Sequence, residues 1–210
     1  FTFYNMTNEY ADYDRDGDEI ARYYKKRIGE EIFFSRVTDN EFITNQITLK
    51  NRDDKYKGKV DGYDSNQYFE GVDEGRYLGE DVAAERRKKN FGTTRSITFA
   101  RILDTRDNIY DPREGKRTMY SFEWANFGGD FRFEKYQADY RYYYRMGKDN
   151  VWALNLGAGY ANGDMPLSQR FTVGGSEFLR GYRDDQFKGN SMLKGSLEFR
   201  YPIIKQVQGV

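Results

Sequence analysis

The chain has 210 residues, enough for one domain with a sizeable core, and its 34 basic residues balance its 34 acidic ones. A chain without net charge creates no long-range field that would attract nucleic acid as a partner. It contains no cysteine and no histidine. This excludes disulfides and thiolate chemistry, and it removes the commonest acid–base residue and metal ligand. We therefore expect no cofactor and no metal.

Aromatic residues make up 18% of the chain, although 32% of its residues are charged and the mean hydropathy is −0.96. No run of about 18 apolar residues occurs, so a transmembrane helix is excluded. A transmembrane β-barrel, however, places its apolar residues at alternate positions, which mean hydropathy does not detect. The chain opens with no signal peptide and Phe1 reads as part of a strand, so we interpret it as a piece of a longer precursor.

The clearest predicted strand covers residues 131–146. Its even positions carry an aromatic face and its odd positions a mostly charged one, and a period of two over this length indicates a strand. The aromatic face holds Tyr136, Ala138, Tyr140, Tyr142, Tyr144 and Met146, and the other holds Lys135, Gln137, Asp139, Arg141, Tyr143 and Arg145.

Similar alternation predicts strands at 116–127, 150–162 and 190–203. Less regular patterns predict strands at 1–10, 21–35, 41–52 and 94–106, and the last residues, 206–210, resemble the start of a ninth. A soluble β-sandwich is the alternative, with the apolar faces turned inward. The apolar faces are nevertheless rich in Tyr and Trp, which is typical of the girdles at membrane interfaces. We predict an all-β fold, a transmembrane antiparallel β-barrel of which this chain supplies about eight of about 16 strands.

The predicted connections alternate in length along the chain. Short turns fall at 37–41, 107–115, 147–150 and 202–205, and longer or more variable connections at 12–19, 53–93, 127–130 and 162–189. Outer-membrane barrels have short periplasmic turns and long extracellular loops. Residues 53–93 are rich in Asp, Lys, Gly and Glu and are interpreted as a solvated extracellular loop without assigned function.

One strand–turn motif, LDTRDNIYDPREGKR, lies between two of the strands and contains Asp104, Arg106, Asp107, Pro112 and Gly115. The Asp-Pro pair favours a turn, and Gly115 can adopt a positive φ. A well-capped hairpin explains these residues without any further function.

The connection 162–189 is longer than structureless loops usually are. Arg180 stands at its centre, and its guanidinium could bind the carboxylate of Glu198 on the next strand through two parallel hydrogen bonds. We therefore expect a loop that folds inward, although an ordinary surface arginine is the simpler alternative. Glycines at three positions would let its backbone approach its neighbours closely: Gly174, Gly175 and Gly181.

The sequence GGSEFLRGY, followed by a strand that ends in LEFRYP, resembles the loop-and-strand signature of the BamA-type family of bacterial surface antigen barrels. That family has Val-Arg-Gly-Phe or Val-Arg-Gly-Tyr, and here Leu179 replaces the valine before Arg180, Gly181 and Tyr182. The resemblance is clear over 94–210, where the strand–turn motif also fits, and weak over 1–93. It implies that Arg180 lies inside the barrel and contacts an acidic residue on the following strand, which Glu198 matches.

The resemblance also implies a function, the folding and insertion of β-barrel proteins into the bacterial outer membrane. Residues 1–210 would then be a carboxy-terminal barrel domain, incomplete at both ends, with its seam strands and periplasmic repeats outside this chain. Expected partners are unfolded outer-membrane protein clients, outer-membrane lipid and accessory lipoproteins, and not nucleic acid. A polypeptide secretion transporter of the same family and a passive porin are the alternatives.

Enzyme chemistry finds little support in the sequence. There is no Ser/His or Cys/His pair, no HExxH motif and no P-loop. Neighbouring carboxylates such as Asp184 and Asp185 are better explained as solvated loop residues, although an acidic catalytic dyad remains open. We predict a protein without catalytic residues.

Overall fold

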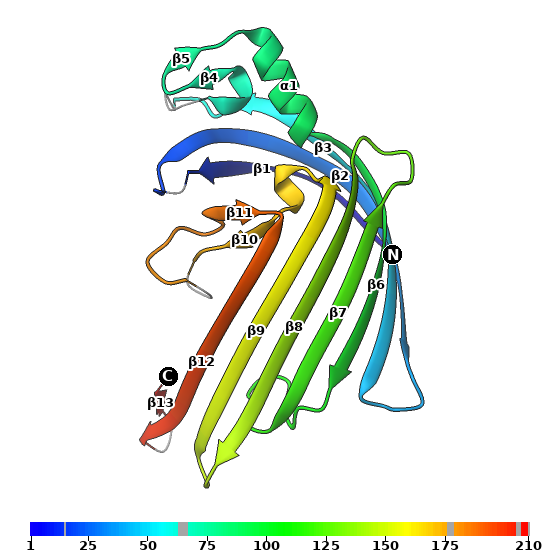
Figure 1. The fold of residues 1–210 in the computed structure, drawn as a ribbon, viewed down its shortest axis with the longest axis vertical. Coiled ribbons are helices and arrows are strands. Elements are labelled where there is room, and N and C mark those ends of the chain that lie inside the picture. Colours follow the sequence, from blue (N-terminus) through cyan, green and yellow to red (C-terminus); the bar gives the residue numbers. More distant parts are fainter. Residues whose placement is uncertain (15, 63–66, 176–178, 205–206, 210) are drawn as a thin grey trace.

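The computed structural model describes residues 1–14, 16–62, 67–175, 179–204 and 207–209. Its main feature is a nine-stranded antiparallel sheet that curves into the wall of a barrel, with each strand paired to the next in the order β1-β2-β3-β6-β7-β8-β9-β12-β13 (Figure 1). The strands are β1 (Thr2–Tyr13), β2 (Glu19–Val37), β3 (Ile43–Lys59), β6 (Gly92–Asp104), β7 (Gly115–Ala125), β8 (Arg132–Met146), β9 (Asn150–Asp164), β12 (Ser191–Ile204) and β13 (Val207–Gly209).

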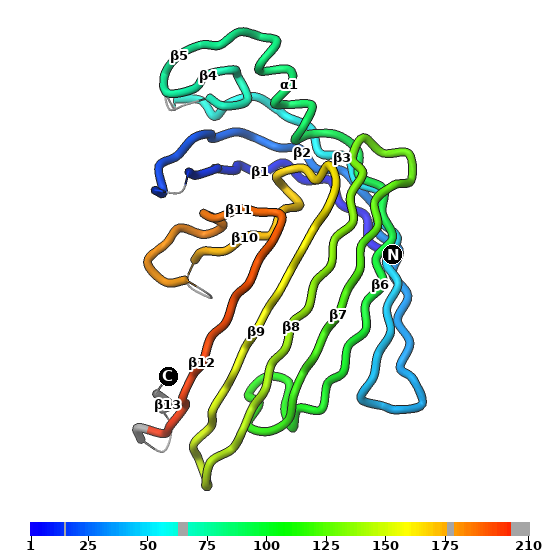
Figure 2. The backbone as a smooth tube through the Cα atoms, in the orientation of Figure 1, coloured from blue at the N-terminus to red at the C-terminus, as the bar shows by residue number. Residues whose placement is uncertain are grey.

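These strands confirm the predicted fold and the eight predicted strands, and β13 agrees with the ninth that was expected at 206–210, whose first and last residues lie outside the described part. The three early strands β1, β2 and β3 are longer than predicted. β3 continues past Arg52 to Lys59, because its inward-facing charged residues have polar partners on the barrel interior and need no water there. The tube in Figure 2 shows how these long strands lean across the wall.

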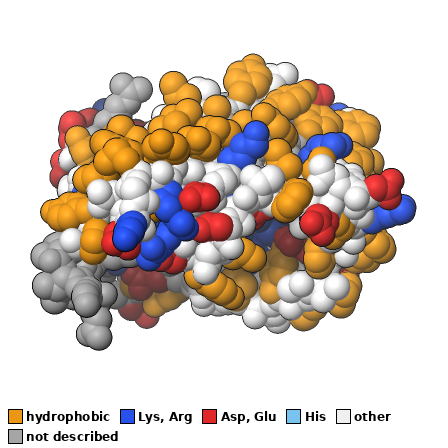
Figure 3. All heavy atoms as spheres, turned by 90° about the horizontal axis from the view of Figure 1, so that it is seen from below, with side chains coloured by type: hydrophobic (Ala, Val, Ile, Leu, Met, Phe, Trp, Pro, Cys, Tyr) orange, Lys and Arg blue, Asp and Glu red, His pale blue; other side chains and the backbone are white. Residues whose placement is uncertain are grey.

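The two faces of the wall carry the side chains that the alternation predicts. On β8, Tyr136, Tyr142 and Tyr144 face outward and are 43%, 40% and 54% exposed, while Phe133 and Asp139 face inward and are buried. Seen from the end where β8 and β9 join, hydrophobic side chains follow the outer arc of the wall and charged ones gather toward the middle (Figure 3). No helix in the described part of the chain is long and apolar enough to cross a membrane.

The connections alternate between two ends of the wall, as predicted. At what we call the short-turn end lie the connections 38–42, 105–114 and 147–149. At the long-loop end lie 14–18, 60–91, 126–131 and 165–190. The two ends are opposite each other in Figure 1.

The expectation of a plain solvated loop at 53–93 was wrong. Residues 67–91 instead fold into a cap that contains a 3₁₀ turn (Tyr68–Glu70), the short hairpin β4 (Val72–Asp73) and β5 (Arg76–Tyr77), and helix α1 (Glu80–Asn90). Phe69 is 2% exposed, and its ring lies 4.8–5.9 Å from the rings of Tyr23, Tyr56, Tyr68 and Phe91. Composition concealed this structure, because a few aromatic residues suffice to fold a segment whose other residues are polar.

The arginines of α1 hold the cap together. The Arg86 guanidinium donates to the carbonyls of Tyr68 and Val72, at 3.1 Å each, and Arg87 donates to the carbonyl of Phe69 at 2.9 Å. These bonds tie α1 to the 3₁₀ turn and to β4.

Candidate functional site

The connection 165–190 folds inward, as predicted. After β9 it forms a 3₁₀ turn (Leu167–Gln169) and a small hairpin of β10 (Phe171–Val173) and β11 (Phe187–Gly189). In Figure 1 this hairpin lies within the curve of the wall, between β1 and β12. We call residues 165–190 the inner loop.

The apolar anchor of the inner loop is Phe171. It is 4% exposed and packs with Phe131, Phe133 and Met165 among other small apolar residues. Gly159 on β9 makes room for its ring, because a Cβ atom at that position would lie 2.4 Å from a ring carbon. The inner loop is therefore packed against the face of β9 that carries Gly159.

Three polar contacts tie the first part of the inner loop to the inner face of three strands. The Lys135 ammonium on β8 donates to the carbonyl of Gln169 at 2.7 Å. The amide of Gln169 donates to the Thr94 hydroxyl on β6 at 3.2 Å, and the Ser168 hydroxyl donates to Asp54 on β3 at 3.1 Å. The loop thus bridges strands that are not neighbours in the sheet.

The wall beneath these contacts carries a buried charge network. Arg27 binds Asp54 with two hydrogen bonds of 2.7 and 3.0 Å, and a second guanidinium, that of Arg52, lies 3.5 Å from the same carboxylate. Further along, Glu123 accepts from Lys50 and from the Ser96 hydroxyl, both at 2.7 Å. Paired and hydrogen-bonded charges of this kind hold a fixed geometry in a place that could otherwise admit water.

The second part of the inner loop reaches the amino-terminal strands. The Lys188 ammonium pairs with the buried carboxylate of Asp12, which also accepts from the Tyr23 hydroxyl at 3.2 Å. The guanidinium of Arg183 lies over the ring of Tyr13, 4.9 Å from its centre. The inner loop therefore joins β1 to β8 and β9 across the interior.

The structure does not bring Arg180 and Glu198 together. Arg180 is exposed at the turn of the inner loop, and Glu198 accepts hydrogen bonds of 3.1 and 3.3 Å from Arg200, two residues along β12. Neither ion pairs nor hydrogen bonds link Arg180 to Glu198, both of which are described. The lock that the sequence predicted is thus not formed in this arrangement, and its role stays a prediction.

The other predicted residues of the inner loop, Tyr182 and the three glycines, lie in different surroundings. Tyr182 is 48% exposed and its ring lies 5.2 Å from that of Phe187. The loop glycines have the positive φ expected of them: φ is +145° at Gly174, +83° at Gly175 and +94° at Gly181. The expected close approach is confirmed at Gly174 and Gly175, which lie against Arg183 and Asp184, but not at Gly181, which faces open space. The residues between them, 176–178, lie outside the described part of the chain.

The strand–turn motif forms a braced turn at the short-turn end. Arg106 binds Asp104 at 2.7 and 2.8 Å, and Asp107 accepts from the backbone N–H groups of Asn108, Arg113 and Glu114 at 2.9–3.1 Å. Pro112 is buried, and Gly115 has a φ of +96° and no room for a Cβ atom. Within the described residues, this motif makes no contact with Arg180 or Glu198, and a well-capped turn accounts for it.

Several anchors of the inner loop were missed from the sequence. Phe171, Lys135 and Lys188 showed no signature, because Lys135 binds a backbone carbonyl and Lys188 binds a carboxylate far away in the chain. Periodicity did place Lys135 on the inner face of its strand, and that was the one usable signal.

Comparison with known proteins agrees with this architecture. The model of the Omp85 superfamily domain matches residues 2–210. The chain belongs to the Omp85 superfamily. Its fold is accordingly that of an outer-membrane β-barrel wall of the BamA type, as the motif had indicated.

Two relatives give this family membership more detail. The outer membrane protein assembly factor BamA of Nitratidesulfovibrio vulgaris is 28% identical over 107 residues, which are 48% of this chain and 13% of that protein. The crystal structure of BamA from Haemophilus ducreyi lacking POTRA domains 1-3 matches with a TM-score of 0.70 at 18% identity, over 96% of this chain and 42% of that one. The chain thus spans less than half the length of either relative, and the structural likeness concerns the fold.

Proposed function

We propose that this protein folds and inserts β-barrel proteins into the bacterial outer membrane. What supports this most is the family match over 2–210, together with a relative that is named an outer membrane protein assembly factor. In this proposal the long-loop end is extracellular and the short-turn end periplasmic, the clients are unfolded outer-membrane proteins, and accessory lipoproteins assist. The protein carries out no covalent chemistry.

The physical task is to pair the backbone N–H and C=O groups of the client, because the hydrocarbon of the membrane offers them no hydrogen-bond partner. Each unpaired N–H or C=O in hydrocarbon costs several kcal/mol, so a client strand enters lipid readily only if its backbone is paired as it enters. A barrel that opens at a weak seam offers a strand edge to which a client strand can add. The seam itself is proposed to lie outside residues 1–210.

The part of the wall described here would keep its shape while such a seam opens. From β6 to β12 the pairing runs without a register shift, and the inner loop binds this block to β3 and β1. Register shifts occur in the β1–β2, β2–β3 and β12–β13 pairs. The inner loop is then a brace, and a pairing of Arg180 with Glu198 in a second arrangement of its turn would strengthen that brace.

The proposal is tested by depleting the full-length protein from cells and measuring the abundance of folded outer-membrane barrels. We expect a general loss of barrel proteins and an accumulation of their unfolded forms. An outer-membrane proteome that stays intact would contradict assembly. Loss of one secreted polypeptide alone would point to the secretion transporter, and loss of solute uptake alone to a porin.

Reconstitution sharpens this test. Liposomes that contain the full-length protein should convert an unfolded client barrel to its heat-modifiable folded form faster than empty liposomes do. The number of periplasmic repeats encoded ahead of this region separates the family alternatives, since about five favour assembly and two favour secretion. A porin should also tolerate Arg180→Ala, with unchanged insertion and conductance.

A further inference from the structure

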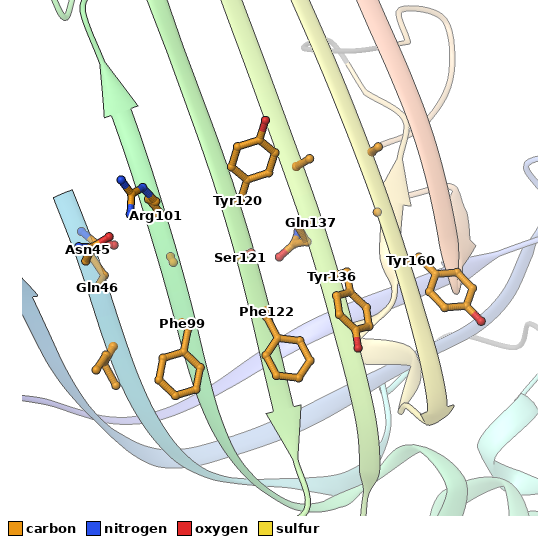
Figure 4. A pocket seen from close by; sticks show the side chains of 15 residues that line it. Asn45, Gln46, Phe99, Arg101, Tyr120, Ser121, Phe122, Tyr136, Gln137 and Tyr160 are labelled. Atoms are coloured by element: carbon orange, nitrogen blue, oxygen red, sulfur yellow. The ribbon is translucent and has the colours of Figure 1, made fainter. Parts of the chain in front are cut away.

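The outer face of the wall contains a hollow between rows of side chains. Across β6, β7, β8 and β9 one row is formed by rings that lie side by side, those of Phe99, Phe122, Tyr136 and Tyr160 (Figure 4). Two residues further along each strand, the next row toward the short-turn end contains two small side chains, Ala138 and Ala158, which are direct cross-strand partners. The following row is bulky again, with Tyr140 opposite Leu156. The two alanines therefore form the floor of a groove with a volume of about 740 Å³.

The row of the alanines changes from apolar to cationic as it crosses the sheet. Ala158 pairs with Ala138, Ala138 with Tyr120, Tyr120 with Arg101, and Arg101 with Asn45. Asn45 in turn pairs with Arg36 on β2. Arg36 and Arg101 are thus two strand spacings apart, about 10 Å, with the amide of Asn45 between them.

Both arginines are exposed, and neither makes a hydrogen bond or ion pair with any described residue. Two unpaired guanidinium groups on the lipid-facing side of a barrel are costly near the middle of the bilayer but tolerable near its boundary. Arg36 is followed by one more strand residue before the connection 38–42, and Arg101 precedes the connection 105–114 by three. Both therefore lie close to the short-turn end, where lipid headgroups would be found.

We propose that this groove binds one glycerophospholipid, with its phosphate at Arg36, Asn45 and Arg101 and an acyl chain over Ala138 and Ala158. Guanidinium groups bind phosphate oxygens through paired, charge-assisted hydrogen bonds, and the amide adds a further donor. The chain lies over the two alanines, between the aromatic row and the row of Tyr140 and Leu156, and passes the ring of Tyr120, which stands between Ala138 and Arg101. Because the row crosses tilted strands, it descends from the alanines toward the headgroup position at the short-turn end.

The inner alternative, an anion site at Arg52, is weaker. Its Nε and Nη2 atoms are buried and donate no hydrogen bond to a described residue, but Nη2 forms an ion pair with Asp54 at 3.5 Å and a water molecule would suffice as acceptor. The groove is the better candidate because its shape and its charges both fit a single lipid. Lipid binding in the groove does not depend on the proposed assembly function, because any barrel in the outer membrane contacts phospholipid.

The proposal is tested on the full-length protein in detergent by native mass spectrometry after addition of phosphatidylglycerol. We expect one retained lipid in the wild type, and a loss of affinity of about thirtyfold in the Arg36→Gln/Arg101→Gln double variant, the effect of two basic residues near an anionic lipid. Ala138→Leu/Ala158→Leu should abolish retention with both arginines in place, because the side chains fill the groove.

The matched control is Arg95→Gln. Arg95 faces outward on the same strand as Arg101, but it already donates to Asn51 and to the carbonyl of Gly128, each at 3.2 Å. Its variant should retain lipid as the wild type does. Heat modifiability of each variant shows that the barrel is folded. Equal retention by wild type and double variant would overturn the proposal, as would retention of lipid A in place of phosphatidylglycerol.

Discussion

The two long connections at the same end of the wall, the cap and the inner loop, are built in opposite ways. The cap packs on the wall through an apolar core, with Phe69 at the centre and Tyr23 on β2 and Tyr56 on β3 around it. In the described part of the inner loop, Phe171 is the fully buried aromatic anchor, and the other contacts are polar bonds to side chains of the wall. The cap is thus held against the wall by buried rings, whereas the inner loop is held mainly by separate polar bonds.

The two loops also meet. The side-chain oxygen of Asn90, at the end of α1, accepts a hydrogen bond of 3.2 Å from the backbone N–H of Leu167, and the Leu167 side chain packs against the aromatic cluster of the cap. A rigid cap therefore fixes the start of the inner loop, and the polar contacts fix the rest. Substitutions in the cap and at the polar contacts of the inner loop should separate these two contributions to the position of the loop.

The largest effect is expected from Phe69→Ala. Removing a fully buried aromatic side chain costs about 3–5 kcal/mol, here from the stability of the cap. Hydrogen exchange should rise sharply over 67–91 and little over β6 to β9. Tyr77→Ala, at a ring that is 62% exposed in the same cap, is the control and should change nothing. If both variants behave alike, Phe69 does not hold the cap in place.

A smaller effect is expected from Lys135→Met, which removes the charged donor to the Gln169 carbonyl. A hydrogen bond to a charged group contributes about 1.5–3 kcal/mol. Hydrogen exchange should therefore rise over 165–175 while the cap stays protected. The matched variant Lys50→Met removes an inward lysine that binds Glu123 instead, so it should weaken the wall without releasing the loop.

Gly159→Ala tests the packing of the Phe171 ring against β9. The new methyl group would meet the ring at 2.4 Å, and overpacking of this kind costs about 1–3 kcal/mol. We expect the inner loop to loosen, as measured by protease cleavage within 165–190. In Gly157→Ala the new methyl group meets only the flexible side chain of Lys194, which can move aside. Equal cleavage of the two variants would show that Phe171 is not held by β9.

The smallest effect concerns the turn 105–114, which like the inner loop is held by polar bonds. Desolvation raises the pKa of Asp107, but three backbone N–H donors outweigh it, so that the pKa lies below its usual value. Because this pKa is lowered, the bonds stabilise the turn fully at a pH above the ordinary Asp pKa of about 3.9. The stabilisation is lost as the pH falls through the pKa of Asp107 in the folded protein. The amide resonances of Arg113 and Glu114 should shift in that acid range, and Asp107→Asn should remove the shift.

How much of this was predictable differs between the wall and its loops. The strands of the wall were predicted from the alternation of apolar and polar residues, because the position of a residue such as Tyr136 or Asp139 in the strand determines the face on which it lies. The inward course of 165–190 was also predicted, but from Arg180 and Glu198, which do not meet. Its actual contacts, such as Lys188 with Asp12, join residues far apart in the sequence and depend on the curvature of the sheet. The cap was missed because its core is made by a few rings spread among charged residues.

The most direct test of the brace is a thiol cross-link between the inner loop and the wall, which is simple to interpret because residues 1–210 contain no cysteine. The Gln169 amide nitrogen lies 3.2 Å from the Thr94 hydroxyl, so a short bifunctional thiol reagent that spans about 8 Å should join Thr94→Cys/Gln169→Cys in the full-length protein in the outer membrane. Thr98→Cys/Gln169→Cys is the control, because Thr98 lies on the same face of β6 about 13 Å further along the strand. We expect rapid cross-linking of the first pair and none of the second. Failure of the first pair, or equal cross-linking of both, would contradict the proposed brace.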